Sequence, residues 1–374
     1  MSNLYFHFPF CKQACHYCNF HFSTAIKSKD LIWDAMIKEL QLRSDEVKSP
    51  LESIYFGGGS PSLISPEKIN SLLKKIKNQF SVLNTVEITL EVNPDDVTKN
   101  YLIELKQAGI NRLSLGTQSF FDEDLKLMNR AHNSDQAIEA LENVTNQFQN
   151  FSIDLIYGMP NSNITSWEKN IQRALKFNPP HISAYALTVE KKTVLYDQIK
   201  NKKIELISDE EVKEQYDLLV LKMNTLGFVN YEFSNFGKPG FFSINNQNYW
   251  NGKSYIGIGP SAHSYDGDVL RSWNISNNQL YVKSISSGEL NFEKEKLSSK
   301  DLYNEYIMTG LRKIEGLSLS YVKIKFGKPY AEYLEAQVDK NLKSRNFYWD
   351  GDYLKISQKA KFLTDGLAAD LFRI

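Results

Sequence analysis

Residues 4–18, LYFHFPFCKQACHYC, place every cysteine of the chain directly after a short apolar segment typical of a β-strand. Cys11, Cys15 and Cys18 are the only thiols among the 374 residues. Three soft thiolates this close together can bind three irons of an iron–sulfur cluster and leave a fourth iron without a protein ligand. An iron left open in this way can bind a small molecule. The segment after Phe8 is therefore the first candidate site.

Short β-rich runs alternate with amphipathic helical stretches from residue 4 to about residue 235. The expected strands are Leu4–Phe8, Ser53–Phe56, Val86–Val92, Arg112–Thr117, Ile153–Tyr157 and Ile182–Leu187. The expected helices are Asp30–Val47, Pro66–Gln79, Thr98–Ala108, Ser134–Phe148, Thr165–Phe177 and Asp209–Leu226. Single helices between short apolar strands predict parallel βαβ units, arranged either as a barrel-like sheet or as a doubly wound one.

Unusual residues gather at the end of each expected strand. The cysteines follow the first strand and Gly57–Gly58–Gly59 the second, and later strand ends carry polar groups. These groups are Glu91, Asn93, Gln118, Ser119, Gly158, Pro160, Thr188 and Glu190. Ligand sites of α/β barrels lie on the C-terminal rim of the strands, so we expect one site there. Turn formation alone would explain any one of these clusters, but it explains all six together poorly.

Composition narrows the class of protein. Lys and Arg total 44, as do Asp and Glu, so the net charge is zero and favours neither nucleic acid nor an anionic membrane as partner. No stretch approaches the roughly 18 apolar residues that span a bilayer, and the first residues lack the regions of a secretory signal. An odd set of three clustered cysteines is a poor disulfide framework. We therefore expect a cytoplasmic protein that is not integral to a membrane.

The C-terminal third divides into two parts. Residues 228–275 are rich in aromatic residues and asparagine, and we expect them to lie against the open side of the sheet. Ser284–Lys296 reads as a domain boundary, which predicts one domain at 1–283 and a second at 297–374. The second contains expected helices Ser299–Lys313, Ser318–Phe326, Pro329–Arg345 and Lys359–Phe372. A hairpin, FYWDGDYLKIS, precedes the last helix and completes a winged-helix-like pattern.

Winged helices often bind DNA, but the third helix of this module lacks a one-sided basic stripe. Its basic residues Lys340, Lys343 and Arg345 are matched by the acidic residues Glu332, Glu335 and Asp339. We therefore expect no nucleic-acid partner.

The cysteine spacing by itself allows two other interpretations. A zinc site could take its fourth ligand from His7, His16 or His21, and the three free thiols could also occur together by chance. Structural zinc motifs more often use paired CxxC elements, and only Cys15 and Cys18 have that spacing here.

CKQACHYC resembles the CxxxCxYC motif of radical S-adenosylmethionine (SAM) proteins, with Tyr17 in the aromatic position. The resemblance continues through YFGGGSPS, LEVNPDD, GINRLSLGTQSF, LKLMNRAH, SIDLIYGMP and HISAYALTVE. It implies an incomplete (β/α)6 barrel in which the three cysteines hold a 4Fe–4S cluster and SAM chelates the fourth iron. The implied SAM contacts are Tyr5, Tyr17, Gly58, Gly59, Ser60, Glu91, Gln118, Arg130, Asp154 and Ala186.

Some of these residues have simpler interpretations as well. Asp154 could cap the turn after its strand, Arg130 could form a surface ion pair, and Gln118 could be satisfied by backbone. No residue is assigned a catalytic role.

The order of the motifs resembles the subfamily that contains oxygen-independent coproporphyrinogen oxidases and their haem-chaperone relatives. The oxidase has a fourth cysteine two residues after the third, where this chain has Phe20, and a long N-terminal extension, where this chain has ten residues before Cys11. The resemblance therefore favours a haem carrier, with haem or a porphyrin as ligand, a haem-acceptor protein that could be membrane-associated, and an electron donor. Porphyrinogen oxidation is the alternative.

The carriers' HNxxYW motif corresponds to Asn245–Trp250, NNQNYW, so asparagine stands where that motif has histidine. Histidine is the usual haem ligand, and the ligand is therefore left open. The histidines are His7, His16, His21, His132, His181 and His263, of which His263 is nearest in sequence to the aromatic region. Tyr249, Trp250 and Trp273 could stack on a porphyrin, although aromatics more often belong to a core.

Overall fold

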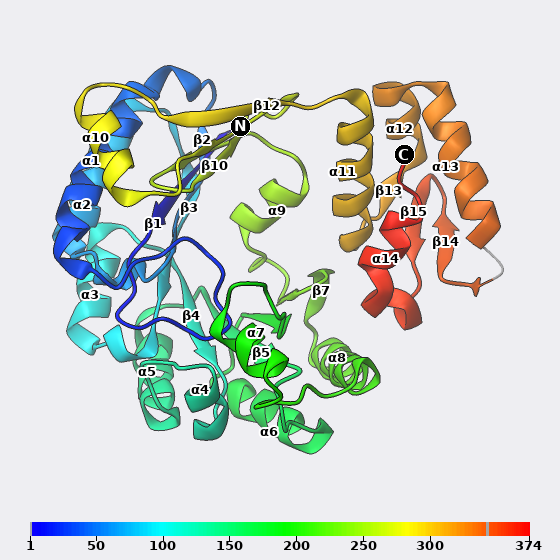
Figure 1. Ribbon diagram of the computed structural model, residues 1–374, viewed down its shortest axis with the longest axis horizontal. Coiled ribbons are helices and arrows are strands. Elements are labelled where there is room, and N and C mark those ends of the chain that lie inside the picture. Colours follow the sequence, from blue (N-terminus) through cyan, green and yellow to red (C-terminus); the bar gives the residue numbers. More distant parts are fainter. Residues whose placement is uncertain (1, 342–343) are drawn as a thin grey trace.

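The computed structural model describes residues 2–341 and 344–374 (Figure 1). Its centre is a sheet of six parallel strands, as the sequence predicts. The strands pair in chain order, which is the barrel-like arrangement and not the doubly wound one. They are β1 (Ser2–Phe8), β2 (Leu51–Gly58), β3 (Val82–Val92), β4 (Arg112–Gln118), β5 (Phe151–Tyr157) and β6 (His181–Ala186). No pairing joins β6 to β1 among the described strands, so the barrel stays open.

Helices connect successive strands. They are α1 (Lys29–Leu42), α2 (Pro66–Gln79), α3 (Lys99–Ala108), α5 (Ser134–Gln147), α6 (Ile164–Leu175) and α8 (Asp209–Thr225). Local signals set their bounds: Asn133 opens α5 with a capping box, and Gly109 at φ 109° ends α3. The sequence did not predict α4 (Asp122–Leu127) or α7 (Val194–Lys200), because six or seven residues are too few to show a helical period.

The two faces of the central sheet differ in chemistry. On β3, Ile88, Leu90 and Val92 are buried in the apolar core. Successive side chains of a strand point to opposite faces, so the alternate residues Glu87, Thr89 and Glu91 point away from that core. We call the face that they occupy the inner face of the sheet. The register carries this alternation across the sheet, since Thr89 pairs with Arg112, Glu91 with Ser114 and Asp154 with Ser183. The inner face is therefore polar.

Both edges of the central sheet are extended by the segment after residue 228. Beside β6 lie β8 (Asn235–Gly237) and β7 (Val229–Glu232), and on the other edge β9 (Tyr255–Ile258) runs parallel to β1. The hairpin of β10 (His263–Tyr265) and β11 (Leu270–Asn274) follows β9. Between the two extensions, α9 (Ile244–Trp250) contacts β2. The aromatic-rich segment thus extends the sheet at both edges as well as lying against it.

The predicted boundary at 284–296 is partly sheet. β12 (Phe292–Lys296) follows α10 (Asn278–Ser286) and pairs with β11, so this stretch completes the twelve-stranded sheet. A second hydrophobic core begins at Tyr303. The division into domains at 1–283 and 297–374 stays a prediction.

The C-terminal module contains most of its expected elements. They are α11 (Ser299–Arg312), β13 (Leu317–Ser318), α12 (Leu319–Phe326), α13 (Lys328–Asn341), β14 (Phe347–Asp350), β15 (Tyr353–Ile356) and α14 (Thr364–Ala369). The expected helix Pro329–Arg345 includes residues 342 and 343, which lie outside the described residues. The expected last helix is split, because Gln358–Leu363 is a 3₁₀ turn that precedes α14. Assignment of the module as a winged helix stays a prediction.

The C-terminal module contacts β7 and α8 (Figure 1). The amide of Ile314 donates to the carbonyl of Tyr231 at 3.1 Å, and Lys361 Nζ donates to Asn230 Oδ1 at 2.7 Å. Phe362 packs on Tyr216 with ring centroids 6.0 Å apart. Among the described residues, no helix has the length and apolar character that crossing a membrane requires.

A buried ion pair fixes the added strands to α1. Glu39 and Arg43 are 0% and 3% exposed, and Glu39 Oε1 accepts from Arg43 at 3.1 Å. Its carboxylate also accepts from Gly259 N at 2.8 Å, Asn274 Nδ2 at 2.7 Å and Tyr281 Oη at 2.6 Å. These donors come from the segments around β9, β11 and α10, so one carboxylate holds the extension at the β1 edge of the sheet.

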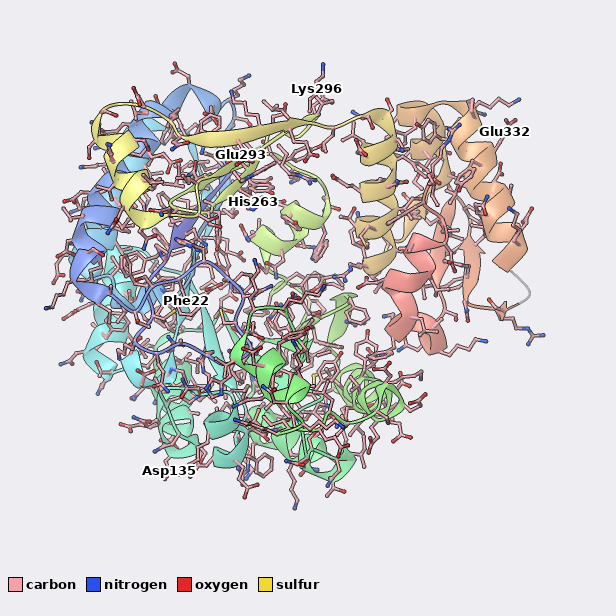
Figure 2. The ribbon with its side chains drawn as sticks, in the orientation of Figure 1. Phe22, Asp135, His263, Glu293, Lys296 and Glu332 are labelled. Atoms are coloured by element: carbon pink, nitrogen blue, oxygen red, sulfur yellow. The ribbon has the colours of Figure 1, made fainter. Side chains whose placement is uncertain are left out.

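We expect Glu39→Gln to lower the free energy of unfolding by on the order of 3 kcal/mol, because its amide nitrogen would face hydrogen-bond donors in a buried site. Glu332→Gln is the matched control, since Glu332 pairs with Lys328 at the same helical spacing but in solvent (Figure 2). That change should cost less than about 0.5 kcal/mol. Urea unfolding of both variants measures the difference, and equal losses would contradict the role given to Glu39.

Candidate functional site

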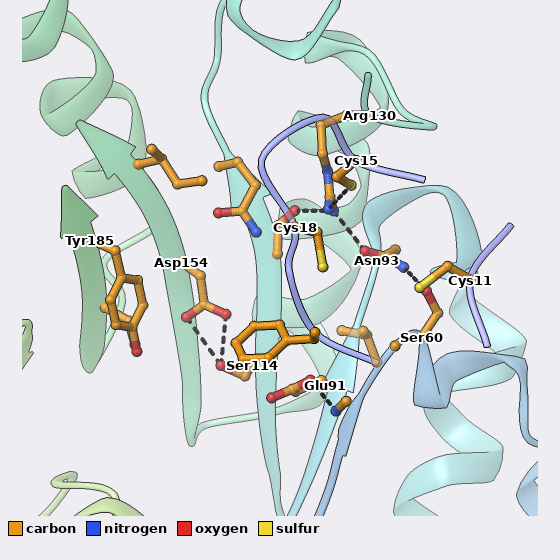
Figure 3. Close-up of a pocket in the computed structure, with 18 of the residues that line it drawn as sticks. Cys11, Cys15, Cys18, Ser60, Glu91, Asn93, Ser114, Arg130, Asp154 and Tyr185 are labelled. Carbon is orange, nitrogen blue, oxygen red and sulfur yellow. Dashed lines mark hydrogen bonds between the residues drawn. The ribbon is translucent and has the colours of Figure 1, made fainter. Parts of the chain in front are cut away.

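A cavity of about 540 Å³ opens at the C-terminal ends of the central strands. All three cysteines line it (Figure 3). So do nine of the ten predicted SAM contacts, namely Tyr17, Gly58, Gly59, Ser60, Glu91, Gln118, Arg130, Asp154 and Ala186. Segments separated by up to 175 residues (Cys11 to Ala186) therefore meet at one place. Their roles as ligand contacts stay predictions.

Tyr5 is the predicted contact that does not line the cavity. Its ring stacks on Tyr55 with centroids 5.9 Å apart, and its hydroxyl lies 3.2 Å from His7 Nδ1. Tyr55, directly opposite on β2, lines the cavity in its place. The spacing between Tyr5 and Cys11 could not show that Tyr55 lines the cavity and Tyr5 does not, because Tyr55 belongs to the neighbouring strand.

The loop that carries the three cysteines, residues 11–18 (the cysteine loop), is attached to the turn that follows α4. Asn129 stands at φ 55°, and its side chain donates to Ala14 O at 2.7 Å and accepts from Gln13 Nε2 at 2.7 Å. His16 adds two bonds to the same turn, from its amide to Met128 O and from its Nδ1 to Leu127 O. The motif LKLMNRAH thus positions the loop as well as supplying Arg130.

The three thiols face the cavity beside a permanent cation. Arg130 Nη1 lies 3.4 Å from Cys15 Sγ, and Nη2 donates to Asn93 Oδ1 at 2.7 Å and Gly116 O at 3.0 Å (Figure 3). Arg130 therefore forms no surface ion pair. Burial raises the pKa of Cys11 to about 11 and also raises the pKa of Cys18, so a bound metal centre must stabilise their thiolates.

These donors fit an iron–sulfur cluster better than a single metal ion. In the described parts of the chain, no three His, Cys, Asp or Glu side chains are placed to hold one ion. Of the histidines offered as a fourth zinc ligand, His7 has both ring nitrogens near protein partners. His16 and His21 each bond through one nitrogen, to Leu127 O and Asn278 Oδ1, and neither forms a three-residue metal-binding group with the cysteines in the described structure. Cysteines that bind separate irons of a cluster need not converge on one point.

The glycine-rich strand end lets two segments approach closely. A Cβ on Gly59 would lie 2.5 Å from Phe10 O, and the Gly59 and Ser60 amides donate to Phe8 O and Phe10 O. The Gly58 amide donates to Glu91 Oε2 at 3.2 Å. These three amides are therefore occupied by protein acceptors. The Gly59 and Ser60 amides join the end of β2 to the segment that precedes Cys11, and the Gly58 amide joins it to β3. The roles of Gly58, Gly59 and Ser60 as SAM contacts stay predictions.

Two carboxyl groups with altered pKa values lie deeper in the cavity. Burial raises the pKa of Glu91 to about 7, although Tyr55 Oη donates to it at 2.9 Å. Burial raises the pKa of Asp154 to about 6, although Ser114 donates at 2.8 Å and Ser152 at 3.0 Å. Asp154 therefore bonds to inner-face hydroxyls and caps no turn. Both groups can exchange a proton near neutral pH and can attract a cation when ionised.

Asn93 and Gln118, at the ends of β3 and β4, complete the lining of the cavity. Asn93, which the sequence noted only as a strand end, donates to Ser60 Oγ at 2.7 Å and accepts from Arg130, so it joins the glycine-rich turn to that cation. Gln118 holds the left-handed conformation at φ 63°, which is uncommon for a residue with a side chain. Its strained backbone lies at the cavity, where such strain is often retained for function.

Comparison with known proteins agrees with this geometry. Residues 5–174 match the model of the radical SAM superfamily. The chain is 32% identical to the haem chaperone HemW of Bacillus subtilis over 88% of each chain, and 30% identical to that of Lactococcus lactis over 98% of each. A solved structure, coproporphyrinogen III oxidase HemN from Escherichia coli, superposes with a TM-score of 0.85 over 99% of this chain and 90% of its own, at 21% identity. That likeness establishes a shared fold.

We expect Asn129→Gly to weaken retention of a reconstituted cluster several-fold. Glycine keeps the left-handed backbone at no cost but removes both bonds to the cysteine loop. Iron content and the rate of iron loss to a chelator measure the effect. Asn161→Gly is the matched control, since Asn161 is exposed at φ 63° and lies outside the cavity lining. Equal iron loss from both variants would refute this role of Asn129.

We expect Glu91→Gln to stabilise the metal-free protein at pH 8 but not at pH 4.5. The folded pKa of about 7 exceeds the ordinary value of 4.5, so ionisation of Glu91 increasingly penalises the native state between these values. The advantage of the variant over the unmodified protein should grow by roughly 2–3 kcal/mol across this window. Urea unfolding at several pH values measures it, and a pH-independent difference would contradict the raised pKa.

Proposed function

Because the chain belongs to the radical SAM superfamily and to its HemW group, we propose that it is a haem chaperone that binds haem and transfers it to an acceptor protein. The observation that carries the proposal is identity of 30–32% to HemW proteins over nearly the whole chain. Membership also implies a 4Fe–4S cluster and SAM. Haem, the acceptor and an electron donor belong to the proposal, as does a cytoplasmic location, where thiols remain reduced.

The cavity supplies the residues that this role requires. Cys11, Cys15 and Cys18 would hold the cluster, which supplies a single electron to SAM when both are bound. Arg130 would balance the negative charge of the sulfur ligands from its position beside Cys15. Ionised Glu91 and Asp154 would attract the cationic part of SAM, and the neighbouring hydroxyls of Tyr55 and Ser114 hold the two carboxyls in place.

Oxidative decarboxylation of a porphyrinogen is the second candidate, and the shared fold with HemN favours it. Phe20, where the oxidase motif has a fourth cysteine, is 68% exposed at the mouth of the cavity. No thiol is therefore available at that position. This difference makes the oxidase the weaker proposal.

The segment of α9 that corresponds to the HNxxYW motif, Asn245–Trp250, contains no histidine. The Asn245 amide donates to Glu87 Oε1 at 3.2 Å, and its Oδ1 accepts weakly from Ser53 Oγ at 3.4 Å. Asn245 thus contributes to the hydrogen bonding at the start of the helix. If the protein binds haem, the axial ligand must come from elsewhere.

We expect the anaerobically reconstituted protein to contain about four irons and to show a changed EPR signal of its reduced cluster when SAM is added. Haem titration should give a saturable Soret shift. Incubation with dithionite, SAM and coproporphyrinogen should give no divinyl product. Appearance of that product would favour the oxidase, and absence of haem binding would remove the chaperone proposal.

A further inference from the structure

We propose that haem binds on the inner face of the added strands β9–β11, with His263 as its axial ligand. The inference rests on the proposed haem-chaperone function and assigns it a site. This surface is built from residues that follow the motif segment in α9, and it lies beside the cysteine cavity along the same sheet.

The six histidines differ in their availability. His7 and His181 are buried with both ring nitrogens near protein partners. His132 is buried, and His16 and His21 each use one nitrogen within the cysteine loop's contacts. His263 is exposed, and in the described structure neither of its ring nitrogens has a hydrogen-bond partner. Its pKa is lowered by desolvation, which favours the neutral imidazole that ligates iron.

Strand register places aromatic groups around His263. His263 pairs with Trp273, and Tyr265 pairs with both Arg271 and Tyr255, so these five side chains share one face. Tyr255 pairs with Asn3 of β1, which identifies this as the inner face of the sheet. Glu293 of β12 pairs with Trp273 and therefore lies two strands from His263 on the same face. The opposite face is buried, since Ser264 accepts from Arg43.

The aromatic rings form a surface suited to a flat macrocycle. The His263 and Trp273 rings lie 5.8 Å apart with an interplanar angle of 25°. Tyr255 continues the surface to Tyr249 of α9, with ring centroids 5.7 Å apart. Tyr249 is 52% exposed, so this part of the motif contributes a ring to the same surface. A planar porphyrin can therefore gain stacking contacts while an unoccupied imidazole reaches its iron.

Charged groups restrict how the haem carboxylates can lie. Glu293 and Glu295 of β12 share this face with Trp273 and Arg271, and they repel a propionate. Arg271 is a cation on this face, and it is paired with Glu305 of α11 and, at 3.9 Å, with Glu295 of β12. A propionate that binds Arg271 must compete with Glu305, which joins the sheet to the C-terminal module. Haem binding would therefore weaken that contact.

The test is a titration of the full-length protein with haem and, separately, with metal-free protoporphyrin. His263→Ala should weaken haem binding at least tenfold and change the Soret maximum, while leaving protoporphyrin binding within about twofold. Trp273→Leu should weaken both ligands alike. Glu305→Gln should strengthen both, because it removes the closer of the two carboxylates that pair with Arg271. His21→Ala is the control histidine and should leave the haem spectrum unchanged.

The outcomes separate this site from the proposed function. If the unmodified protein binds no haem, the chaperone proposal fails. If it binds haem and His263→Ala keeps the same affinity and spectrum, this site is wrong while the chaperone proposal stands. Exposure of His263 makes misfolding of the variant a minor concern, and circular dichroism checks it. A loss of both ligands in His263→Ala would reject axial ligation and leave only a packing role.

Discussion

The structure depends on an alternation in its central strands, with apolar side chains on one face and mostly polar side chains on the other. The outer face gains the free energy of burial because Leu4, Phe6 and their counterparts pack under the helices. The inner face cannot form an ordinary barrel core, since Glu87, Thr89 and Glu91 of β3 all point inward. The open barrel therefore keeps a cavity in the place where a closed barrel packs side chains.

The cavity combines groups whose desolvation would be costly without a ligand. Arg130 Nε and Thr89 Oγ1 are buried without a hydrogen-bond partner in the described structure, and Glu91 and Asp154 carry raised pKa values. Such groups are tolerated where a bound cluster and a charged cofactor complete their interactions. The end of β2 holds Phe8 and Phe10, and the turn after α4 holds residues 13–16, through backbone and amide contacts that do not use the thiols.

The added strands protect the edges of the central sheet. An open parallel sheet has two edges with unpaired backbone groups, and β9 and β8 cover them. The buried carboxylate of Glu39 then fixes β9, β11 and α10 to α1. This arrangement extends the inner face beyond the cavity and gives it an aromatic surface. Cofactor chemistry and the proposed haem site thus occupy neighbouring parts of one sheet.

The sequence by itself determined the six parallel strands, most helices and the position of the site at the strand ends, because period-two and period-3.6 patterns and strand-end positions are local properties. Arg130, Asp154 and Ala186 were expected at that site only from the resemblance to a known family. The sequence did not show that the Tyr55 ring stacks on Tyr5 or that Asn129 bonds to the cysteine loop. Nor did it show that the amides of Gly58, Gly59 and Ser60 donate to protein acceptors. Nor could it pair β12 with β11 or bring His263 beside Trp273. These features depend on register and on contacts between distant segments, which only tertiary packing decides.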